Sequence, residues 1–320
     1  YMHIKSKIVW MIIFLSTSLM IYTVYTYSNV TDHSIIIGTT YMTMNNTFYE
    51  AINSEVKKIA SQNNCKLVVR DPELDVNKQI RQINAMREEG VNAIIINPVE
   101  GNNKHLIEAL KKAKQDGIYI VVVDSQLSDS QFVDSTIVSD NYHAGVICAQ
   151  DLMKRRTQAK VLLLTHNSAN SAVDRINGFT NTIKAHPEYQ IVDRIDVLGQ
   201  TEIAMPKVSQ YIDEHRNFDV IMSLNDPAAL GSLAALEEKH LNRNMLIYSV
   251  DGSPNMKKFI SDKANHVFTA MQSPEGMARQ SVHTVLQLIK GKQAKKTIKL
   301  NVDQLISKDN INEYNILGWQ

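Results

Sequence analysis

The chain has 320 residues, of which 44% are hydrophobic and 21% are charged. This is enough for two α/β domains that each bury a core of their own. The formal net charge is +1, which gives no strong field toward DNA, RNA or an acidic partner. Cys65 and Cys148 form no metal-type cluster, and nothing in their spacing argues for a disulfide. We therefore expect two separate buried thiols.

Residues 8–27 form an apolar run, IVWMIIFLSTSLMIYTVYTY, that contains no charged residue. A run of this length is about enough to cross a bilayer as a helix. Lys5 and Lys7 precede it, and positive charge on this flank indicates that the rest of the chain lies outside the cell. The alternative is a cleaved signal peptide, but residues 28–31 offer no small-x-small cleavage site, and no cysteine directly follows that could carry a lipid. We expect residues 1–34 to be an uncleaved single-pass transmembrane anchor and its linker.

After residue 34, short apolar runs alternate with amphipathic segments. The pattern predicts strands over residues 35–38, 66–70, 93–96 and 118–123, and helices over residues 48–61, 76–89 and 104–116. The apolar runs are continuous, which is typical of strands buried on both faces. The helical segments place apolar residues on one face, as Ile52, Val56 and Ile59 show. This β-α-β-α order predicts a mostly parallel sheet covered by helices on both faces.

A second series of the same kind begins near Asp140. It predicts helices over residues 142–155, through Gly178 and Phe179, and over 230–239, 254–261 and 275–289, with strands at 161–165, 219–223, 245–250, 267–271 and 297–300. No local sequence repeat is visible. The fold class that we expect is α/β, with two doubly wound parallel-sheet lobes joined by a hinge.

Short polar residues stand where five of the expected strands end. They are Asn97, Asp124, Asn225, Asp251 and Gln272. In open parallel sheets, ligands bind outside the carboxyl ends of the strands. Carboxylates and amides placed together suit a ligand hydroxyl, which both donates and accepts hydrogen bonds. Asn and Asp are also common in turns, so any one of these residues carries little weight alone.

Two further features have a structural and a functional interpretation. Phe48 and Tyr49 stand at the start of a helix, where they either pack in the core or provide an apolar face for a sugar ring, with Asn46 beside them for a hydroxyl. Arg175 is either a surface charge or a planar fork that binds two oxygens of one ligand.

Several short segments, in this order and spacing, match one family. They are Asn45–Tyr49, Ile95–Pro98, Val123–Asp124, Ser139–Asn141, Arg175–Phe179, Asn225–Gly231, Val250–Pro254 and Met271–Gln272. From about residue 35 to 299, the chain resembles the ribose/galactose-type periplasmic binding proteins, whose lobes are shared with sugar-responsive bacterial repressors. The resemblance implies the type 1 periplasmic-binding-protein fold. It implies an N-terminal lobe of residues 35–138 and 274–300, and a C-terminal lobe of residues 139–273 and 301–320.

The resemblance also implies a ligand site with no metal, no cofactor and no catalytic residue. Its ligand residues would be Asn46, Phe48, Tyr49, Asn97, Asp124, Arg175, Asn225, Asp251 and Gln272. The chain departs from the family's pattern in three places. Ser125 stands where ribose binders carry Arg, Gly199–Gln200 occupies the region of a stacking aromatic, and Val250 replaces another aromatic. The ligand is then larger, differently oriented or more weakly held, and Glu202 is a candidate extra contact.

Three classes of function were compared. A repressor would need a helix-turn-helix before the first lobe, where this chain has an apolar run, so nucleic acid is not expected as a partner. An enzyme is not supported, because P-loop, G-x-S-x-G, H-E-x-x-H and G-x-G-x-x-G patterns are lacking. Two binding roles remain. The chain looks similar to membrane-anchored sugar-binding partners of LytS-type sensor histidine kinases, so we expect a sensor of a monosaccharide, a pentose such as xylose or ribose. Delivery of sugar to an ABC permease is the alternative.

Overall fold

A computed structural model of the chain describes residues 13–21, 34–215, 217–241, 245–263 and 266–319. The chain divides into two units, Tyr1–Ile35 and Ile36–Gln320. In the first unit, residues 13–21 are helical and exposed, and the remainder of the expected anchor at 8–27 lies outside the described residues. No helix within the described ranges is long and apolar enough to span a membrane.

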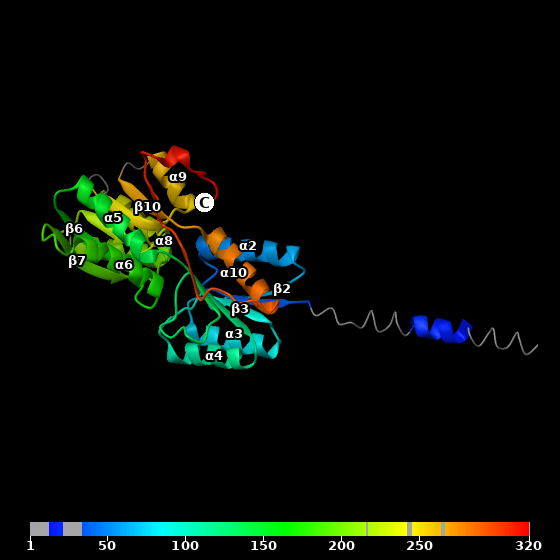
Figure 1. Cartoon of the computed structure of the whole chain (residues 1–320). Coiled ribbons are helices and arrows are strands. Elements are labelled where there is room, and N and C mark those ends of the chain that lie inside the picture. Colours follow the sequence, from blue (N-terminus) through cyan, green and yellow to red (C-terminus); the bar gives the residue numbers. More distant parts are fainter. Residues whose placement is uncertain (1–12, 22–33, 216, 242–244, 264–265, 320) are drawn as a thin grey trace, which may run out of the picture. The chain divides into compact units, whose positions relative to one another are not determined.

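The second unit contains two six-stranded sheets, and Figure 1 shows them with their helices. One has the order β11-β5-β4-β3-β1-β2 and is parallel throughout; we call it, with the helices that pack on it, the N-terminal lobe. Its strands are β1 (Ile36–Thr40), β2 (Lys66–Arg70), β3 (Ala93–Ile96), β4 (Tyr119–Val123), β5 (Ser135–Ser139) and β11 (Thr297–Leu300). Its helices are α2 (Thr47–Gln62), α3 (Val76–Glu88), α4 (Lys104–Gln115) and α10 (Pro274–Ile289).

The other sheet has the order β12-β10-β9-β8-β6-β7, and only the short β12 runs antiparallel to its neighbour. With its helices, it forms the C-terminal lobe. Its strands are β6 (Ala159–Thr165), β7 (Tyr189–Asp196), β8 (Val220–Ser223), β9 (Leu246–Asp251), β10 (Val267–Met271) and β12 (Leu305–Ile306). Its helices are α5 (Asn141–Arg155), α6 (Asn170–Ile183), α7 (Thr201–Glu214), α8 (Asp226–Glu238), α9 (Pro254–Lys263) and the short η2 (Ile311–Glu313).

The central strands are apolar and fully buried, as the sequence predicts. All four residues of β3 and all four residues of β8 are buried. Each lobe has its own apolar cluster, one around Ile94, Ile120 and Leu110 and one around Leu163, Phe179 and Tyr248. Cys65 and Cys148 are both buried free thiols, as expected.

Five elements are not predicted by the sequence: β5, β7, α7, β12 and η2. β7 alternates polar and apolar residues and is only partly buried, so it lacks the continuous apolar run used to find the other strands. α7 contains Pro206 inside the helix, and a proline at such a position normally argues against a helix because it removes a backbone hydrogen bond.

The chain passes between the two sheets three times, and these passages form the hinge. They are residues 140, 272–273 and 301–304, which join β5 to α5, β10 to α10 and β11 to β12. Two backbone hydrogen bonds tie them to neighbouring elements: Asp140 N–H donates to Leu300 O at 2.8 Å, and Met271 N–H donates to Gln304 O at 2.9 Å. A connection of three short, parallel passages permits the lobes to rotate as rigid bodies.

Helices α5 and α6 lie unusually close together because each carries a glycine at the point of contact. A Cβ on Gly145 would overlap the Arg175 carbonyl oxygen, and a Cβ on Gly178 would overlap the Tyr142 carbonyl oxygen. This approach brings the middle of α6, where Arg175 lies, against the start of α5.

Candidate functional site

Arg175 lies at the centre of the site, on α6 in the C-terminal lobe. Its side chain is buried, and two hydrogen bonds fix its orientation. Nε donates to the Asn141 side-chain oxygen at 2.8 Å, and Nη1 donates to the Leu224 carbonyl at 2.9 Å. The guanidinium is therefore attached to the hinge on one side and to the end of β8 on the other. The interpretation of Arg175 as a surface charge is wrong, because only 4% of the residue is exposed.

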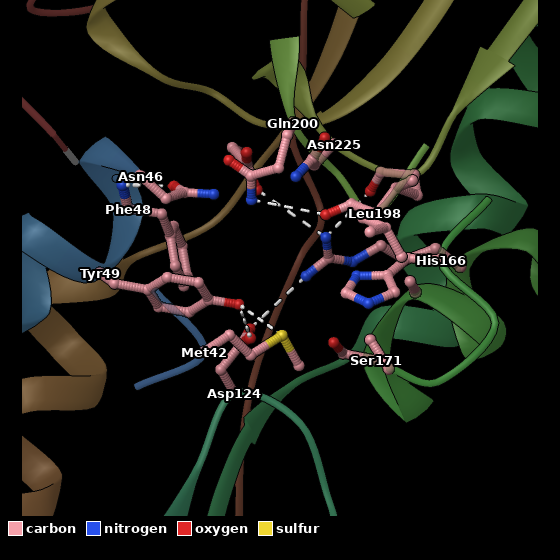
Figure 2. Close-up of a pocket in the computed structure, with 15 residues that line it drawn as sticks. Met42, Asn46, Phe48, Tyr49, Asp124, His166, Ser171, Leu198, Gln200 and Asn225 are labelled. Atoms are coloured by element: carbon pink, nitrogen blue, oxygen red, sulfur yellow. Dashed lines mark hydrogen bonds and ion pairs between the residues drawn. The ribbon is translucent and has the colours of Figure 1, made fainter. Parts of the chain in front are cut away.

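Asp124 reaches the guanidinium from the N-terminal lobe, where it follows β4. Its Oδ1 lies 3.6 Å from Arg175 Nη2. Its Oδ2 accepts hydrogen bonds from Tyr49 Oη at 3.3 Å and from Asn97 Nδ2 at 3.1 Å, and Figure 2 shows Tyr49 and Asp124 directed toward one another. Asp124 has a φ of +64°, a left-handed conformation that non-glycine residues rarely adopt and that is concentrated at functional positions.

Asp251 ends β9 in the C-terminal lobe and provides a second carboxylate for the same guanidinium. Its Oδ1 lies 3.8 Å from Arg175 Nη1 and accepts a hydrogen bond from Gln272 Nε2 at 2.8 Å. Its Oδ2 accepts from the Asp226 backbone N–H at 3.2 Å. Asp226 itself is fully buried and accepts from Ser249 Oγ at 2.5 Å and from Thr269 Oγ1 at 2.6 Å.

The carboxylates of the site are buried away from water, and burial disfavours their charged form. Burial raises the pKa of Asp124, although Arg175 and the two hydrogen bonds oppose the rise. Burial and the neighbouring Asp226 raise the pKa of Asp251 well above its ordinary value, and Arg175 again opposes the change. Burial, followed by the charge of Asp124, raises the pKa of Tyr49, so its hydroxyl stays protonated and acts as a donor.

Two buried acceptor atoms near Arg175 have no hydrogen-bond donor among the described residues. They are Oδ1 of Asp124 and Oε1 of Gln272. A buried acceptor left without a donor costs about 1–3 kcal/mol. Because Asp124 lines a cavity, its free oxygen is available to a hydroxyl that enters from there.

The cavity lies between the lobes and has an empty volume of about 400 Å³, including the part open to solvent. Both lobes contribute to its wall. The lining residues are Met42, Asn46, Phe48, Tyr49 and Asp124 from the N-terminal lobe, and His166, Ala169, Ser171, Ala172, Arg175, Leu198, Gln200, Leu224, Asn225 and Asp251 from the C-terminal lobe.

Seven of the nine residues predicted from the sequence line this cavity: Asn46, Phe48, Tyr49, Asp124, Arg175, Asn225 and Asp251. The other two lie behind it. Asn97 is fully buried, and its amide is committed to Met42 N–H, Val123 O and Asp124. Gln272 lies in a hinge passage and holds Asp251. In this structure, Asn97 and Gln272 therefore orient the two carboxylates from the far side.

Asn46 and Asn225 each also cap a helix. Asn46 Oδ1 accepts from Phe48 N–H at the start of α2, and Asn225 Oδ1 accepts from Ala228 N–H at the start of α8. Nδ2 of Asn225 donates to Gly199 O at 3.0 Å. Both residues thus cap a helix and also lie on the cavity wall.

His166, Ser171, Leu198 and Gln200 line the cavity but were not among the predicted ligand residues. His166 directly follows β6, so the same strand-end rule that identified Asp124 would have found it. Only 5% of His166 is exposed, and burial lowers its pKa while Asp196 opposes the change. Its imidazole is then neutral at pH 7, with one donor and one acceptor nitrogen.

One departure from the family's pattern, Ser125, makes a contact between the lobes, and so does the candidate contact Glu202. Ser125 Oγ accepts from Ser171 N–H at 3.1 Å, and Glu202 Oε1 accepts from Asn45 Nδ2 at 2.9 Å. Gln126 Nε2 donates to Asp174 Oδ2 at 2.8 Å on the hinge side. These bonds join opposite walls of the cleft, so the structure represents lobes in mutual contact. Glu202 lies beside a second hollow next to the cavity, and not in the cavity itself.

Nothing in the described part of the chain is arranged like a metal site of three or more His, Cys, Asp or Glu residues. Asp251 and Asp226 form a close acidic pair, as in some acid–base sites. Both, however, are held by several hydrogen-bond donors each.

Comparison with known proteins agrees with this geometry. Residues 37–293 match the family described as "Periplasmic binding protein domain". The chain is 25% identical over 264 residues to the ribose import binding protein RbsB of Bacillus subtilis, covering 82% of this chain and 84% of the relative. It is 26% identical over 240 residues to the D-apiose import binding protein of Actinobacillus succinogenes, covering 74% and 76%.

Solved structures show the same fold. The periplasmic binding protein component of the arabinose ABC transporter from Shewanella sp. ANA-3, bound to α- and β-L-arabinofuranose, superposes with a TM-score of 0.79 at 25% identity, covering 87% of this chain and 93% of that one. These relatives are named as solute-binding proteins and not as enzymes. The resemblance seen in the sequence is confirmed, and the chain belongs to the periplasmic binding protein family, with ribose-type binding proteins among its relatives.

Proposed function

We propose that the chain binds a monosaccharide, a pentose such as ribose or xylose, between its two lobes. The observation that carries this proposal is the unsatisfied Oδ1 of Asp124, which faces a cavity beside a guanidinium held at 3.6 Å. A sugar hydroxyl placed there donates to Asp124 and accepts from Arg175. Both contacts are charge-assisted, and such bonds are roughly twice as strong as neutral ones.

The rest of the wall supports a sugar by its mixture of surfaces. The Phe48 and Tyr49 rings present apolar area, and Asn46, Gln200 and His166 supply donors and acceptors around it. A sugar has both apolar C–H faces and a rim of hydroxyls, so it matches such a wall. The relatives named for ribose, D-apiose and L-arabinofuranose support a pentose among the sugars.

The mechanism is closure of the lobes around the hinge. Arg175 and Asp251 belong to one lobe and Asp124 to the other, so a ligand that contacts all three bridges the lobes. Such a ligand binds the closed state more tightly than the open state and shifts the population toward it.

The test is a thermal-shift and calorimetric screen of the full chain in detergent, with D-ribose, D-xylose, L-arabinose, D-apiose, D-glucose and D-galactose. A ligand at 100 times its Kd stabilises the folded state by about 2.7 kcal/mol. We expect a raised Tm and measurable binding heat for at least one pentose. An absence of shift and heat across the whole panel would refute the proposal.

The chain is further proposed to be held in the cell membrane by a single helix at residues 8–27, with its lobes outside the cytoplasm. The described part, residues 13–21, is helical and carries exposed Ile13, Phe14 and Leu15. Two of its three hydroxyls bond within the helix, since Ser16 Oγ and Thr17 Oγ1 both donate to the Ile13 carbonyl at 2.9 Å. A helix that satisfies its own polar groups is suited to hydrocarbon.

The output that we propose is signalling to a membrane sensor histidine kinase. An anchored domain stays beside a fixed partner, and its lobes present a different combined surface when they are closed. A second candidate is delivery of sugar to an ABC permease, which the relatives named as import binding proteins favour. Deletion of the gene separates the two roles, because loss of sugar uptake with intact kinase-dependent transcription supports import.

A further inference from the structure

We propose that Trp319 is a positioning residue that latches the two lobes together and holds Phe48 in place on the cavity wall. The segment that carries it, residues 315–319, is attached to the C-terminal lobe, whereas Phe48 belongs to the N-terminal lobe. The contact of the two rings therefore spans the cleft.

The attachment of this segment to the C-terminal lobe depends on one buried ammonium group. Lys257 lies on α9 with none of its surface exposed. Its Nζ donates to the carbonyl oxygens of Asn315 at 2.5 Å and of Gly318 at 2.6 Å. The two carbonyls stand on either side of a turn in which Leu317 N–H donates to Asn315 Oδ1 at 3.1 Å. Trp319 directly follows this clamped turn, so α9 fixes its position.

The other end of the latch is an aromatic chain that leads into the site. The Trp319 and Phe48 rings meet edge to face, with centroids 5.7 Å apart and an interplanar angle of 79°. Phe48 makes the same kind of contact with Tyr49, at 5.7 Å and 81°. The Tyr49 hydroxyl in turn donates to Asp124 at 3.3 Å. A displacement of Trp319 is thereby transmitted through two rings to the carboxylate.

The Trp319–Phe48 contact differs from the polar bonds between the lobes, because it acts on a residue of the cavity wall. The bonds of Ser125 and Gln126 lie near the hinge side, where they join backbone and side-chain polar groups. The Trp319 contact is apolar and acts on a ring that lines the cavity. Because the two rings belong to different lobes, rotation of the lobes about the hinge separates them. The latch therefore favours the closed state and slows the release of whatever the cavity holds.

The chain offers a direct optical test, because its only tryptophans are Trp10 and Trp319. In the full chain with Trp10→Phe, all tryptophan fluorescence comes from Trp319. Lys257→Met removes the clamp and keeps most of the side-chain volume. We expect a red-shifted emission and a larger acrylamide quenching constant, measured without sugar. Lys258→Met is the matched control, since the neighbouring Lys258 is exposed and pairs with Asp262 on the same helix; its spectrum should not change.

A second variant keeps the test decisive if Lys257→Met fails to fold. Phe48→Leu, in the same Trp10→Phe background, leaves the clamp intact and removes the edge-to-face partner. Circular dichroism establishes that the variant is folded. The latch predicts increased quenching of Trp319 in this variant as well. Quenching equal to that of the background in every variant that folds would overturn the proposal.

The effect on binding rests on the proposed function, and it is measured separately for that reason. With the sugar that gives the largest thermal shift in the panel above, Trp319→Ala should raise koff about 2- to 12-fold, the range expected for loss of one aromatic pair. Trp319→Phe should restore much of the slow release. If no sugar binds the wild type, the monosaccharide proposal fails while the quenching experiment still decides the latch. An unchanged koff in Trp319→Ala would contradict the latch alone.

Discussion

Arg175 of the C-terminal lobe places its Nη2 3.6 Å from Oδ1 of Asp124 in the N-terminal lobe. This distance is too long for a good direct hydrogen bond, and the Asp124 oxygen has no donor among the residues that the structure describes. The pair is thus attractive enough to draw the lobes together while leaving hydrogen-bonding capacity for a ligand. The substitutions Asp124→Asn and Arg175→Met each change one member of this pair.

Asp124→Asn should abolish most sugar binding and leave the fold intact. The change keeps the side-chain shape and removes the charge, so it weakens the bonds that a hydroxyl and Arg175 make there. The expected cost is about 1.5–3 kcal/mol, or roughly a 10- to 150-fold rise in Kd. Calorimetry with the best sugar of the panel measures it. Asp129→Asn is the control, because Asp129 is exposed and pairs with Lys111 on the surface. A wild-type Kd in Asp124→Asn would remove this residue from the site.

Arg175→Met should damage both stability and binding. Without the guanidinium, Asp124 and Asp251 remain buried without their shared cation, and removal of one partner of a buried ion pair costs about 3–5 kcal/mol. We expect a lower Tm in the ligand-free protein, together with loss of sugar binding. Arg279→Met should have little effect on either, since the Arg279 side chain is about half exposed and pairs with Glu55 and Glu275 outside the cavity. Equal Tm values for the two variants would show that Arg175 is not the buried cation described here.

Much of this site could be predicted because its polar residues lie where the parallel strands end. Asp124, Asn225 and Asp251 were found by one rule, that ligands bind where parallel strands end. Asn97 and Gln272 obey the same rule but lie one layer back, and only side-chain geometry shows that their amides hold the carboxylates. Strand position identifies a neighbourhood, and it does not show which side chains reach the cavity.

Other parts could not be predicted from local patterns. Trp319 and Phe48 are far apart in the sequence, and no periodicity links residues that meet only after two sheets have formed. β7 lacks an apolar run, and α7 carries a proline, so local rules argued against both elements. His166 differs from these cases, because it also follows the end of a strand. Its imidazole, however, is neither a carboxylate nor an amide, the groups that the strand-end prediction contains.

Gly178→Ala should destabilise the C-terminal lobe and weaken binding through Arg175. The added methyl group would overlap the Tyr142 carbonyl oxygen, so α6 must move away from α5. Overpacking of this kind costs about 1–3 kcal/mol. Because Arg175 stands on the displaced part of α6, its bond to Asn141 should lengthen as well. Lys184→Ala, at an exposed position at the end of the same helix, is the control. An unchanged Tm and Kd for Gly178→Ala would contradict the close packing.

His166 should make the folded state less stable in mild acid. Burial lowers its pKa below the ordinary value of 6.5, so below about pH 6.5 the unfolded chain binds a proton that the folded chain binds less readily. The free energy of unfolding therefore falls as pH drops from about 6.5 toward the folded pKa. Asp124 and Asp251 act in the opposite direction, because their raised pKa values make the folded state hold protons that the unfolded state releases.

The histidine contribution is isolated by comparing wild type with His166→Gln. Urea unfolding is measured from pH 5.0 to 7.5 for both proteins, and the carboxylate contributions cancel in the difference. The stability of wild type relative to His166→Gln should decrease as pH is lowered through this range. His266 is the matched control, since burial also lowers its pKa but it does not line the cavity. Its substitution should alter the pH dependence of stability without altering sugar affinity, whereas His166→Gln should alter both.

A sensor role requires that the partner distinguish closed from open lobes. A partner that contacts both lobes favours the closed state only to the extent that it binds that state more tightly. Linkage then requires the partner to change the sugar affinity by the factor by which sugar changes the partner's affinity.

The experiment titrates the full chain in nanodiscs with the best sugar of the panel, with and without the extracytoplasmic region of a histidine kinase encoded beside it. We expect a lower sugar Kd at saturating kinase region, by about 5- to 150-fold for a typical coupling. Arg175→Met, which cannot bridge the lobes, should bind the kinase region without responding to sugar. An unchanged Kd and an unchanged assembly state would count against sensing and leave delivery to a permease as the output.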